Sequence, residues 1–226
     1  MPAYKLAKAK GLNVVGSDFN PEAPGLKYAD HTLIASTRDA DETLSAVLAF
    51  CQAESIDGVM TIANDVPFTV ACVAKNLDLP GINIESAKLV SDMLLMKMAF
   101  KDSGVSCPWF CSVSDADHLR KLVRENDANR YVIKPVDGRG ARGVLLIDYT
   151  SDFEWAFNEA VRWGECGRVI LEEFTAGLQL STESFLIDRK AYTPAISERN
   201  YEFLERFSPY IIENGGTIPA LLDKYQ

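Results

Sequence analysis

The chain has 226 residues, of which 47% are hydrophobic and 24% charged, and its formal net charge is −9 at pH 7. These values are typical of a folded globular protein with one large domain or two modest ones. Because nucleic acids and anionic membranes attract basic surfaces, the acidic balance argues against both as partners. No segment approaches the roughly 20 apolar residues of a membrane span, and the N-terminal residues lack the apolar core of a signal peptide.

The cysteines indicate a reducing compartment. They are odd in number and scattered, unlike the framework of a secreted disulfide protein: Cys51, Cys72, Cys107, Cys111 and Cys166. Cys107 and Cys111 stand near each other, but the histidines, His31 and His118, are distant in sequence, so we predict buried thiols rather than a zinc site. We therefore expect a cytoplasmic protein.

Residues 1–83 alternate between short β-like segments and amphipathic helices, which predicts a small domain with a parallel sheet. The predicted elements are a helix at 1–10 ended by Gly11, strands at 12–16, 31–35 and 58–62, a helix begun by a capping box at Asp39, and a helix after Asp65. Because the pattern opens on a helix, we expect the first strand of the sheet to be absent. Asn64 and Asp65 follow the last of these strands, where parallel sheets bind ligands, although Asp65 equally fits a helix N-cap.

Residues 84–226 form a longer pattern of helices and strands. The predicted elements are a junction at 84–88, a methionine-rich helix at 92–103 ended by Gly104, a helix capped within 114–117, a helix begun at Ser151, a strand at 168–171, paired strands at 181–187 and 191–196, and a partly helical stretch at 201–214. Together with residues 1–83 this predicts a mixed α/β (α+β) chain of two domains.

A glycine-rich segment lies between two predicted strands. The first strand, 131–136, contains Lys134 and breaks at Asp137-Gly138, and the second is Val144-Leu145-Leu146-Ile147. Three glycines between them allow positive φ and a close backbone approach, and two arginines add charge: Gly138, Gly140 and Gly143, with Arg139 and Arg142. Successive N–H groups in such a loop can form a concave anion site.

This segment formally matches G-x-G-x-x-G, but a dinucleotide-binding fold would follow that motif with a helix. Here an apolar strand follows, so we predict a strand-loop-strand flap. Protein kinases also cover ATP with such a flap, yet no His-Arg-Asp or Asp-Phe-Gly triplet occurs in this chain. The alternative is a structural hairpin whose glycines serve only the turn.

From Lys134 through Glu172-Glu173-Phe174 to Glu183, the order and spacing resemble the nucleotide site of the ATP-grasp family, which includes carbamoyl-phosphate synthase large chains and carboxylate–amine ligases. Residues 1–83 resemble the smaller α/β domain that precedes the ATP-grasp domain in this family. Residues 84–226 would then hold a linker helix (84–104), a flap subdomain (105–173) and an incomplete C-terminal subdomain (174–226). The resemblance implies a chain trimmed at both ends, whose C-terminal strands are missing.

The resemblance implies a role for each of these residues. Lys134 would reach the α-phosphate of ATP. The flap would close over the polyphosphate with Gly138, Arg139, Gly140, Arg142 and Gly143. A hinge of Glu172, Glu173, Phe174 and Thr175 would offer backbone groups to the adenine edge, and Glu183 would lie near the ribose and phosphates. The alternative for Glu172 and Glu173 is a solvated strand end.

The chain departs from the family pattern in two places. Asp92 is followed by Met93 where such proteins usually carry a basic residue that touches phosphate, and Lys97 one helical turn later would substitute, unless it is an ordinary surface lysine. Glu198-Arg199-Asn200 has the letters of the family's Glu-x-Asn metal motif but follows the hinge too closely, so we expect the Mg²⁺ ligands to lie outside this chain. Arg199 itself would face the phosphates.

We therefore predict an ATP-binding protein whose full-length form is an ATP-dependent ligase, joining a small-molecule carboxylate to an amine through an acyl-phosphate with ATP and Mg²⁺. The chain as given is expected to be inactive alone, and a homodimer is left open. One alternative is a non-catalytic nucleotide-binding module, which the departures above favour. A second is a nicotinamide-dependent oxidoreductase, suggested only by Asp18 at a strand end.

Overall fold

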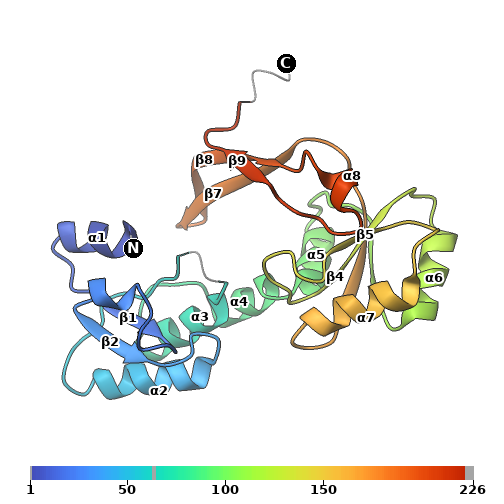
Figure 1. The fold of residues 1–226 in the computed structure, drawn as a ribbon. Coiled ribbons are helices and arrows are strands. Elements are labelled where there is room, and N and C mark those ends of the chain that lie inside the picture. Colours follow the sequence, from blue (N-terminus) through green and yellow to red (C-terminus); the bar gives the residue numbers. More distant parts are fainter. Residues whose placement is uncertain (1, 63–64, 222–226) are drawn as a thin grey trace. The chain divides into compact units, whose positions relative to one another are not determined.

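The computed structural model describes residues 2–62 and 65–221 (Figure 1). It divides into two compact units, Met1–Ala99 and Phe100–Gln226. The boundary falls within helix α5 (Met93–Asp102). Among the described residues, no helix is long and apolar enough to cross a membrane.

The first unit is a small α/β unit. Its elements are α1 (Pro2–Ala9), β1 (Val15–Asp18), the 3-10 turn η1 (Leu26–Tyr28), β2 (His31–Ile34), α2 (Ala40–Phe50), α3 (Pro67–Asn76) and α4 (Ile84–Val90). β1 and β2 pair in parallel, with Val15 opposite His31 and Asp18 opposite Ile34. The predicted parallel sheet is thus confirmed. The predicted cap of α2 is present, since the Asp39 carboxylate accepts hydrogen bonds from the N–H groups of Asp41 and Glu42.

The predicted strand at 58–62 is wrong, because this segment joins no sheet in the structure. Its apolar side chains are exposed, Met60 at 69% and Ile62 at 59%. In the described residues β1 and β2 pair only with each other, so residues 58–62 have no strand neighbour. A β-branched sequence therefore does not become a strand here, because a strand needs a hydrogen-bonding partner.

The predicted cap at Asp65 is also wrong. Helix α3 has Val66 at its N-cap and Pro67 as its first residue. Proline has a fixed φ and no N–H group, and both properties suit the first helical position, so Pro67 determines where α3 begins. Asn64, predicted beside Asp65, lies outside the described residues.

Residues 84–104, predicted as one linker helix, contain two helices. Asn83 caps α4 by accepting a hydrogen bond from the N–H of Ser86 at 2.7 Å. Helix α4 ends at its C-cap, Ser91. The Asp92 carboxylate then accepts a hydrogen bond from the N–H of Leu95 at 3.0 Å at the start of α5. Each helix therefore has its own side-chain cap.

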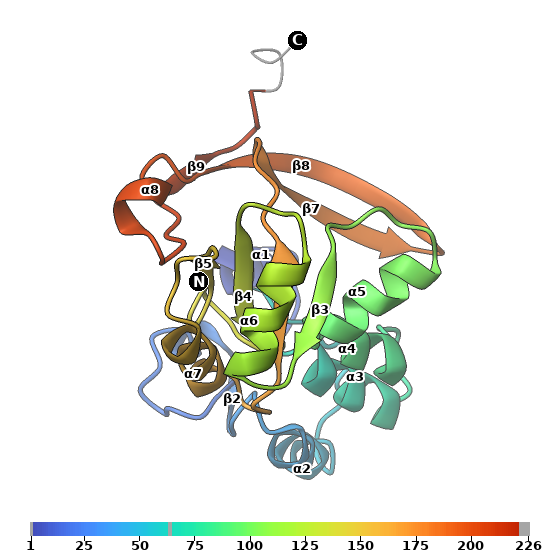
Figure 2. The same cartoon turned by 90° about the vertical axis from the view of Figure 1, so that its right-hand side faces the viewer.

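A four-stranded antiparallel sheet forms the core of the second unit. Its elements are β3 (Phe110–Val113), α6 (Ala116–Glu125), β4 (Tyr131–Pro135), β5 (Leu145–Ile147), α7 (Phe153–Trp163) and β6 (Val169–Glu173). The strand order is β3-β6-β4-β5. Helices α6 and α7 cover one face of this sheet (Figure 2). The buried cluster between them consists of Val113, Leu119, Val123, Tyr131, Ile133, Leu145, Ile147, Phe153, Ala156, Ala160, Val169 and Leu171.

Because side chains alternate along a strand, the face of this sheet away from α6 and α7 carries charged side chains. In β4, Tyr131 and Ile133 point into the helix-covered core, so Val132 and Lys134 point to the opposite face. Glu172 of β6 lies opposite Val132 in the antiparallel register and shares its face. The central strands therefore present Lys134 and Glu172 on the face away from α6 and α7.

A second sheet follows the hinge. It is antiparallel, in the order β7 (Gln179–Ile187), β8 (Lys190–Asn200) and β9 (Gly215–Thr217). The predicted strand pair is confirmed, and β8 runs past its predicted end because β9 pairs with its last three residues. The turn joining β7 and β8 has positive φ at Asp188 and Arg189, as a tight hairpin of this kind requires.

The partly helical stretch predicted at 201–214 contains one short helix, α8 (Leu204–Phe207). The residues after α8 return to the first sheet of the unit. The N–H of Leu146 donates to the carbonyl of Pro209 at 2.7 Å, and Leu145 forms a bridge with Tyr210. The Tyr210 ring packs edge-on against Trp155 of α7, with ring centres 6.2 Å apart.

Candidate functional site

Lys134 and Glu172 form an ion pair on the face of the central sheet away from α6 and α7. The Lys134 Nζ lies 2.9 Å from the Glu172 Oε1, and the two side chains are only 18% and 10% exposed. Glu172 is therefore not a solvated strand end, whereas Glu173, on the next position of β6, is exposed. A lysine held by a strand backbone and by a neighbouring carboxylate is a fixed cation rather than a freely rotating one.

In the glycine-rich loop between β4 and β5, Gly140 and Gly143 have the predicted positive φ, whereas Gly138 does not and Ala141 does. Gly140, Ala141 and Gly143 have φ of 63°, 57° and 69°. The base of the loop is anchored, because the Asp137 carboxylate accepts hydrogen bonds from the N–H groups of Glu165 and Cys166 at 3.2 and 2.9 Å. Residues 140–142 are exposed. The predicted strand-loop-strand flap is thus confirmed as a structure, with its base fixed and its tip open to solvent.

Both arginines of the loop contact groups around the C-terminal end of α7. The Arg142 guanidinium lies 5.7 Å from the ring centre of Trp163. The Arg139 Nη1 lies 3.8 Å from the Glu165 carboxylate, and this nitrogen is buried without a hydrogen-bond partner in the described part of the chain. Contact of either guanidinium with a polyphosphate stays a prediction.

The hinge offers fewer backbone donors than its four residues suggest. The N–H groups of Glu173 and Phe174 donate to the carbonyls of Trp109 and Arg130 at 2.9 and 3.0 Å. Thr175, the last of the four predicted hinge residues, lies after the end of β6, and its N–H takes part in neither of these two hydrogen bonds. It is therefore the candidate for contacting a bound base. The backbone bond from Phe174 to Arg130 also continues the β4–β6 register by one pair, which places both side chains on the face of Lys134 and Glu172.

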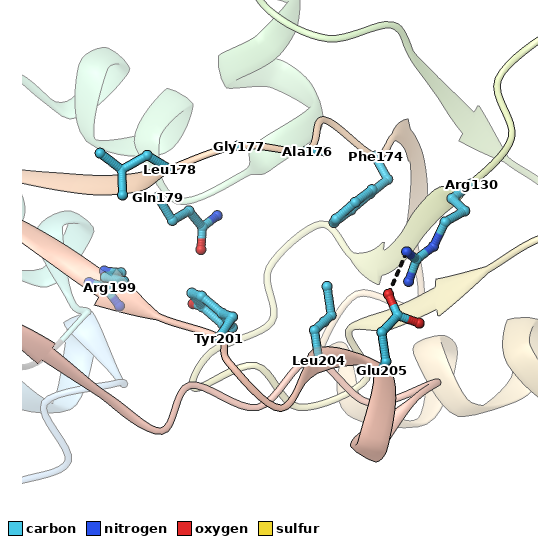
Figure 3. Close-up of a pocket in the computed structure, with 10 residues that line it drawn as sticks. All are labelled: Arg130, Phe174, Ala176, Gly177, Leu178, Gln179, Arg199, Tyr201, Leu204 and Glu205. Carbon is cyan, nitrogen blue, oxygen red and sulfur yellow. Dashed lines mark hydrogen bonds and ion pairs between the residues drawn. The ribbon is translucent and has the colours of Figure 1, made fainter. Parts of the chain in front are cut away.

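A cavity of about 350 Å³ lies at the hinge end of this face (Figure 3). Its lining comes from the hinge loop, the ends of β7 and β8, and α8: Arg130, Phe174, Ala176, Gly177, Leu178, Gln179, Arg199, Tyr201, Leu204 and Glu205. The side chains of Phe174, Gln179, Tyr201 and Leu204 point toward the same space in Figure 3. The cavity therefore combines aromatic walls with a few polar groups, a composition typical of small-molecule sites.

Sequence reasoning had placed only Phe174 and Arg199 of this lining in the site. Gln179 was missed, although it shares a face of β7 with Glu183, four residues further along. Glu183 itself is exposed and does not line the cavity. Strand alternation from Glu183 back to the hinge could have found Gln179, whereas the contributions of Arg130 and α8 depend on folding.

Arg199 lies on the same face of the second sheet, opposite Gln179. Its guanidinium bonds to the Glu213 carboxylate and lies 3.5 Å from the Ser181 hydroxyl. The hydrogen bond and charge of Glu213 raise the pKa of Arg199. The same contact with Glu213 holds the guanidinium in place. Glu198 and Asn200 alternate with Arg199 along β8 and point to the other face.

Two family models match this chain. A PylC-like N-terminal domain matches residues 2–84, and an ATP-grasp domain matches residues 90–225. The chain belongs to the ATP-grasp family. Asp18, the basis for the oxidoreductase alternative, makes a local turn in this ATP-grasp chain by accepting a hydrogen bond from the N–H of Asn20 at 2.9 Å.

Curated relatives of this ATP-grasp chain include two enzymes. A D-alanine–D-alanine ligase of Coprothermobacter proteolyticus is 29% identical over 107 residues, which are 46% of this chain and 34% of that protein. A formate-dependent phosphoribosylglycinamide formyltransferase of Vibrio vulnificus is 26% identical over 173 residues, which are 73% of this chain and 42% of that protein. This chain thus spans less than half the length of either relative.

Solved structures share the fold over nearly the whole chain. An L-amino acid ligase from Bacillus licheniformis superposes with a TM-score of 0.76 at 20% identity, covering 97% of this chain and 51% of that one. An N5-carboxyaminoimidazole synthetase from Staphylococcus aureus complexed with ADP gives 0.74 at 18% identity, covering 98% and 56%. The ATP-grasp architecture is therefore shared with both.

Lys97, predicted as a substitute phosphate contact, belongs to the first unit and is 9% exposed. The alternative of an ordinary surface lysine is wrong, because α5 buries this side chain. Its role toward phosphate stays a prediction, as does the effect of Met93.

ATP-grasp ligases use ATP and Mg²⁺. Within residues 2–62 and 65–221, no group of three His, Cys, Asp or Glu side chains is arranged to hold a metal ion. Glu183 and Glu198 lie on opposite faces of the β7–β8 hairpin, so they do not converge on one ion.

Proposed function

We propose that this chain binds ATP against the face of its central sheet that carries Lys134 and Glu172, and that it is the nucleotide-binding part of an ATP-dependent ligase joining a carboxylate to an amine. The observation that carries the proposal is the Lys134–Glu172 pair, a fixed cation on the face whose hinge end opens into the cavity. Membership of the ATP-grasp family supports it. The names of the relatives, two ligases and a synthetase among them, support the reaction class.

Each part of the site has a physical task in this proposal. Lys134 supplies positive charge to a phosphate, and the exposed flap tip at 140–142 supplies backbone N–H groups in a positive-φ loop. Phe174 and Tyr201 offer aromatic surface to the base, and Gln179 offers an amide that can donate and accept hydrogen bonds. Together these groups bind and orient a triphosphate while the flap excludes water.

The chemistry proposed for the whole protein has two steps. The substrate carboxylate attacks the γ-phosphorus and breaks its bond to the bridging oxygen, which gives an acyl-phosphate and ADP. The amine then attacks the acyl carbon, phosphate leaves, and the amine nitrogen loses a proton. Mg²⁺ would neutralise the charge that develops on the phosphates. The residues described here position the nucleotide, and none acts as a covalent nucleophile.

Calorimetric titration with ATP tests the assignment of Lys134. We expect Lys134→Ala to weaken ATP binding about tenfold to a hundredfold, because a charge-assisted contact contributes roughly 1.5–3 kcal/mol. Lys121→Ala is the matched control, since this lysine lies on α6, is 66% exposed and only approaches Glu125. Equal ATP affinities for the wild type and Lys134→Ala would contradict the assignment.

A non-catalytic nucleotide-binding module is the second candidate. The observation that favours it is the opposite orientation of Glu183 and Glu198, which leaves the hairpin without a shared carboxylate site for Mg²⁺. Phosphate release by the longer protein in the presence of Mg²⁺ would decide between the ligase and this alternative.

A further inference from the structure

One side chain joins two walls of the cavity. The Arg130 guanidinium lies 5.0 Å from the ring centre of Phe174, on the hinge side. Its Nη1 bonds to the Glu205 Oε1 of α8 at 2.7 Å (Figure 3). The Arg130 carbonyl also accepts the N–H of Phe174 at 3.0 Å. Both the backbone and the side chain of Arg130 therefore fix the hinge.

Helix α8 depends on such contacts for its position. It has four residues, and a single helical turn is not stable by itself in water. Its first two residues, Leu204 and Glu205, line the cavity. Beyond α8, the chain is held by the pairing of Pro209 and Tyr210 with β5. Among the described residues, the Arg130–Glu205 ion pair is thus a charged contact that holds α8 beside the cavity.

We propose that Arg130 is a positioning residue of the nucleotide pocket, which holds Phe174 as a fixed wall and α8 as a gate that opens when the bond to Glu205 breaks. The proposal rests on the function proposed above in taking a nucleotide as the occupant. The Glu205 side chain is 77% exposed and that of Arg130 33% exposed. Because exposed ion pairs are weak and screened by salt, the gate opens easily, whereas the Phe174 contact persists.

The gate predicts a pattern in the release of nucleotide. In stopped-flow experiments with a fluorescent N-methylanthraniloyl ATP, we expect Glu205→Ala to speed dissociation about two- to fivefold. Arg130→Ala loses the ring contact as well and should speed it about four- to twentyfold. The double variant should behave like Arg130→Ala, because the Glu205 contact is already lost. Arg130→Lys keeps the charge but not the planar group. We expect it to preserve the ion pair with Glu205 better than the contact with the Phe174 ring.

Arg120 provides a matched control. It too lies over a phenylalanine ring, 5.7 Å from the centre of Phe153, and bonds to a carboxylate, that of Asp117. It belongs to α6 and does not line the cavity. We expect Arg120→Ala to lower the melting temperature about as much as Arg130→Ala while leaving nucleotide dissociation unchanged. Raising the salt concentration should also speed dissociation more steeply in the wild type than in Glu205→Ala.

Hydrogen exchange without nucleotide tests the gate independently. Amides of residues 201–207 should exchange faster in Glu205→Ala, a surface change that keeps the fold, but not in Arg120→Ala. Unchanged exchange in Glu205→Ala would overturn the proposal whether or not the chain binds ATP. Unchanged dissociation in Arg130→Ala and Glu205→Ala, with Lys134→Ala still weakening ATP, would overturn the gate and leave the proposed function standing.

Discussion

The ion pair between Lys134 and Glu172 in the central sheet is the best-defined part of the candidate site. Lys134 and Glu172 come from neighbouring strands and meet on one face of the sheet. On the adjacent strand, the apolar Ile170 lies opposite Lys134 and the apolar Val132 lies opposite Glu172. In such surroundings each charge needs the other, because an unpaired buried charge is costly. The pair therefore keeps a cation in place for a phosphate and also contributes to the stability of the sheet.

Removing one member of this pair should destabilise the fold more than removing both. We expect Lys134→Met to lower the free energy of unfolding by about 2–4 kcal/mol, since it leaves the Glu172 carboxylate without its cation. The double variant Lys134→Met/Glu172→Leu should recover a large part of that loss. Urea denaturation measures both values. A loss in the double variant equal to the sum of the losses in Lys134→Met and Glu172→Leu would show that the pair is not energetically coupled.

Substitutions at two glycines of the flap distinguish the cost of backbone strain from the cost of a steric clash. Gly140 and Gly143 both have positive φ, but a Cβ on Gly140 would meet open space apart from the Arg142 side chain at 3.9 Å. A Cβ on Gly143 would lie 2.9 Å from the Trp163 Cβ. We expect Gly140→Ala to cost about 1 kcal/mol of unfolding free energy and Gly143→Ala clearly more. Urea denaturation that gives the same cost for both would contradict the contact with α7.

At the scale of elements, the flap is a hairpin with a fixed base and an exposed tip. Its base is fixed by the hydrogen bonds of Asp137 and by the packing of Gly143 on Trp163. We expect hydrogen exchange in the absence of ligand to be fast at 140–142 and slower at 143–144. ATP should slow exchange at the tip. Exchange that is already slow at 140–142 without ATP would indicate a rigid structural hairpin.

The loop between β5 and α7 should make stability depend on acidic pH. The Asp148 carboxylate accepts hydrogen bonds from the hydroxyl of Thr150 at 2.6 Å and from its N–H at 2.8 Å. The hydroxyl contact is the main cause that lowers the pKa of Asp148, with Ser151 adding to it. A lowered pKa in the folded state contributes stability above the unfolded pKa of about 3.9, and this contribution is lost as the pH falls through the folded value.

Asp148→Asn tests this dependence. We expect the wild type to exceed the variant by about 1 kcal/mol in unfolding free energy at pH 7, and the difference to shrink as the pH falls below the unfolded pKa of about 3.9. Urea denaturation across this pH range measures it. A constant difference at all pH values would show that the carboxylate charge contributes nothing.

For the whole molecule, we expect the 226-residue chain not to release phosphate from ATP in a Mg²⁺-dependent way. Mg²⁺ is usually held by one or two carboxylates together with phosphates, and Glu183 and Glu198 point to opposite faces of their hairpin. A phosphate-release assay with Glu198→Gln, and Glu125→Gln on α6 as control, checks this. Mg²⁺-dependent release that only Glu198→Gln abolishes would place the metal site at Glu198-Arg199-Asn200.

Local sequence patterns determined much of this protein. The helix caps at Asp39 and Asp115, the strand-loop-strand flap with Lys134, and the β7–β8 pair could be predicted because each depends on residues close together in the chain. The succession of these motifs also indicated the ATP-grasp family. The predicted strand at 58–62 failed because strand formation depends on a neighbour that a local pattern does not reveal.

The tertiary structure alone decided which of the predicted residues meet. It paired Lys134 with Glu172, turned Arg139 and Arg142 toward the end of α7, and built a cavity from the hinge and α8. It also brought Arg130 between Phe174 and Glu205. These contacts join residues far apart in the chain, so they depend on sheet register and on how helices pack, which no local pattern of side chains specifies.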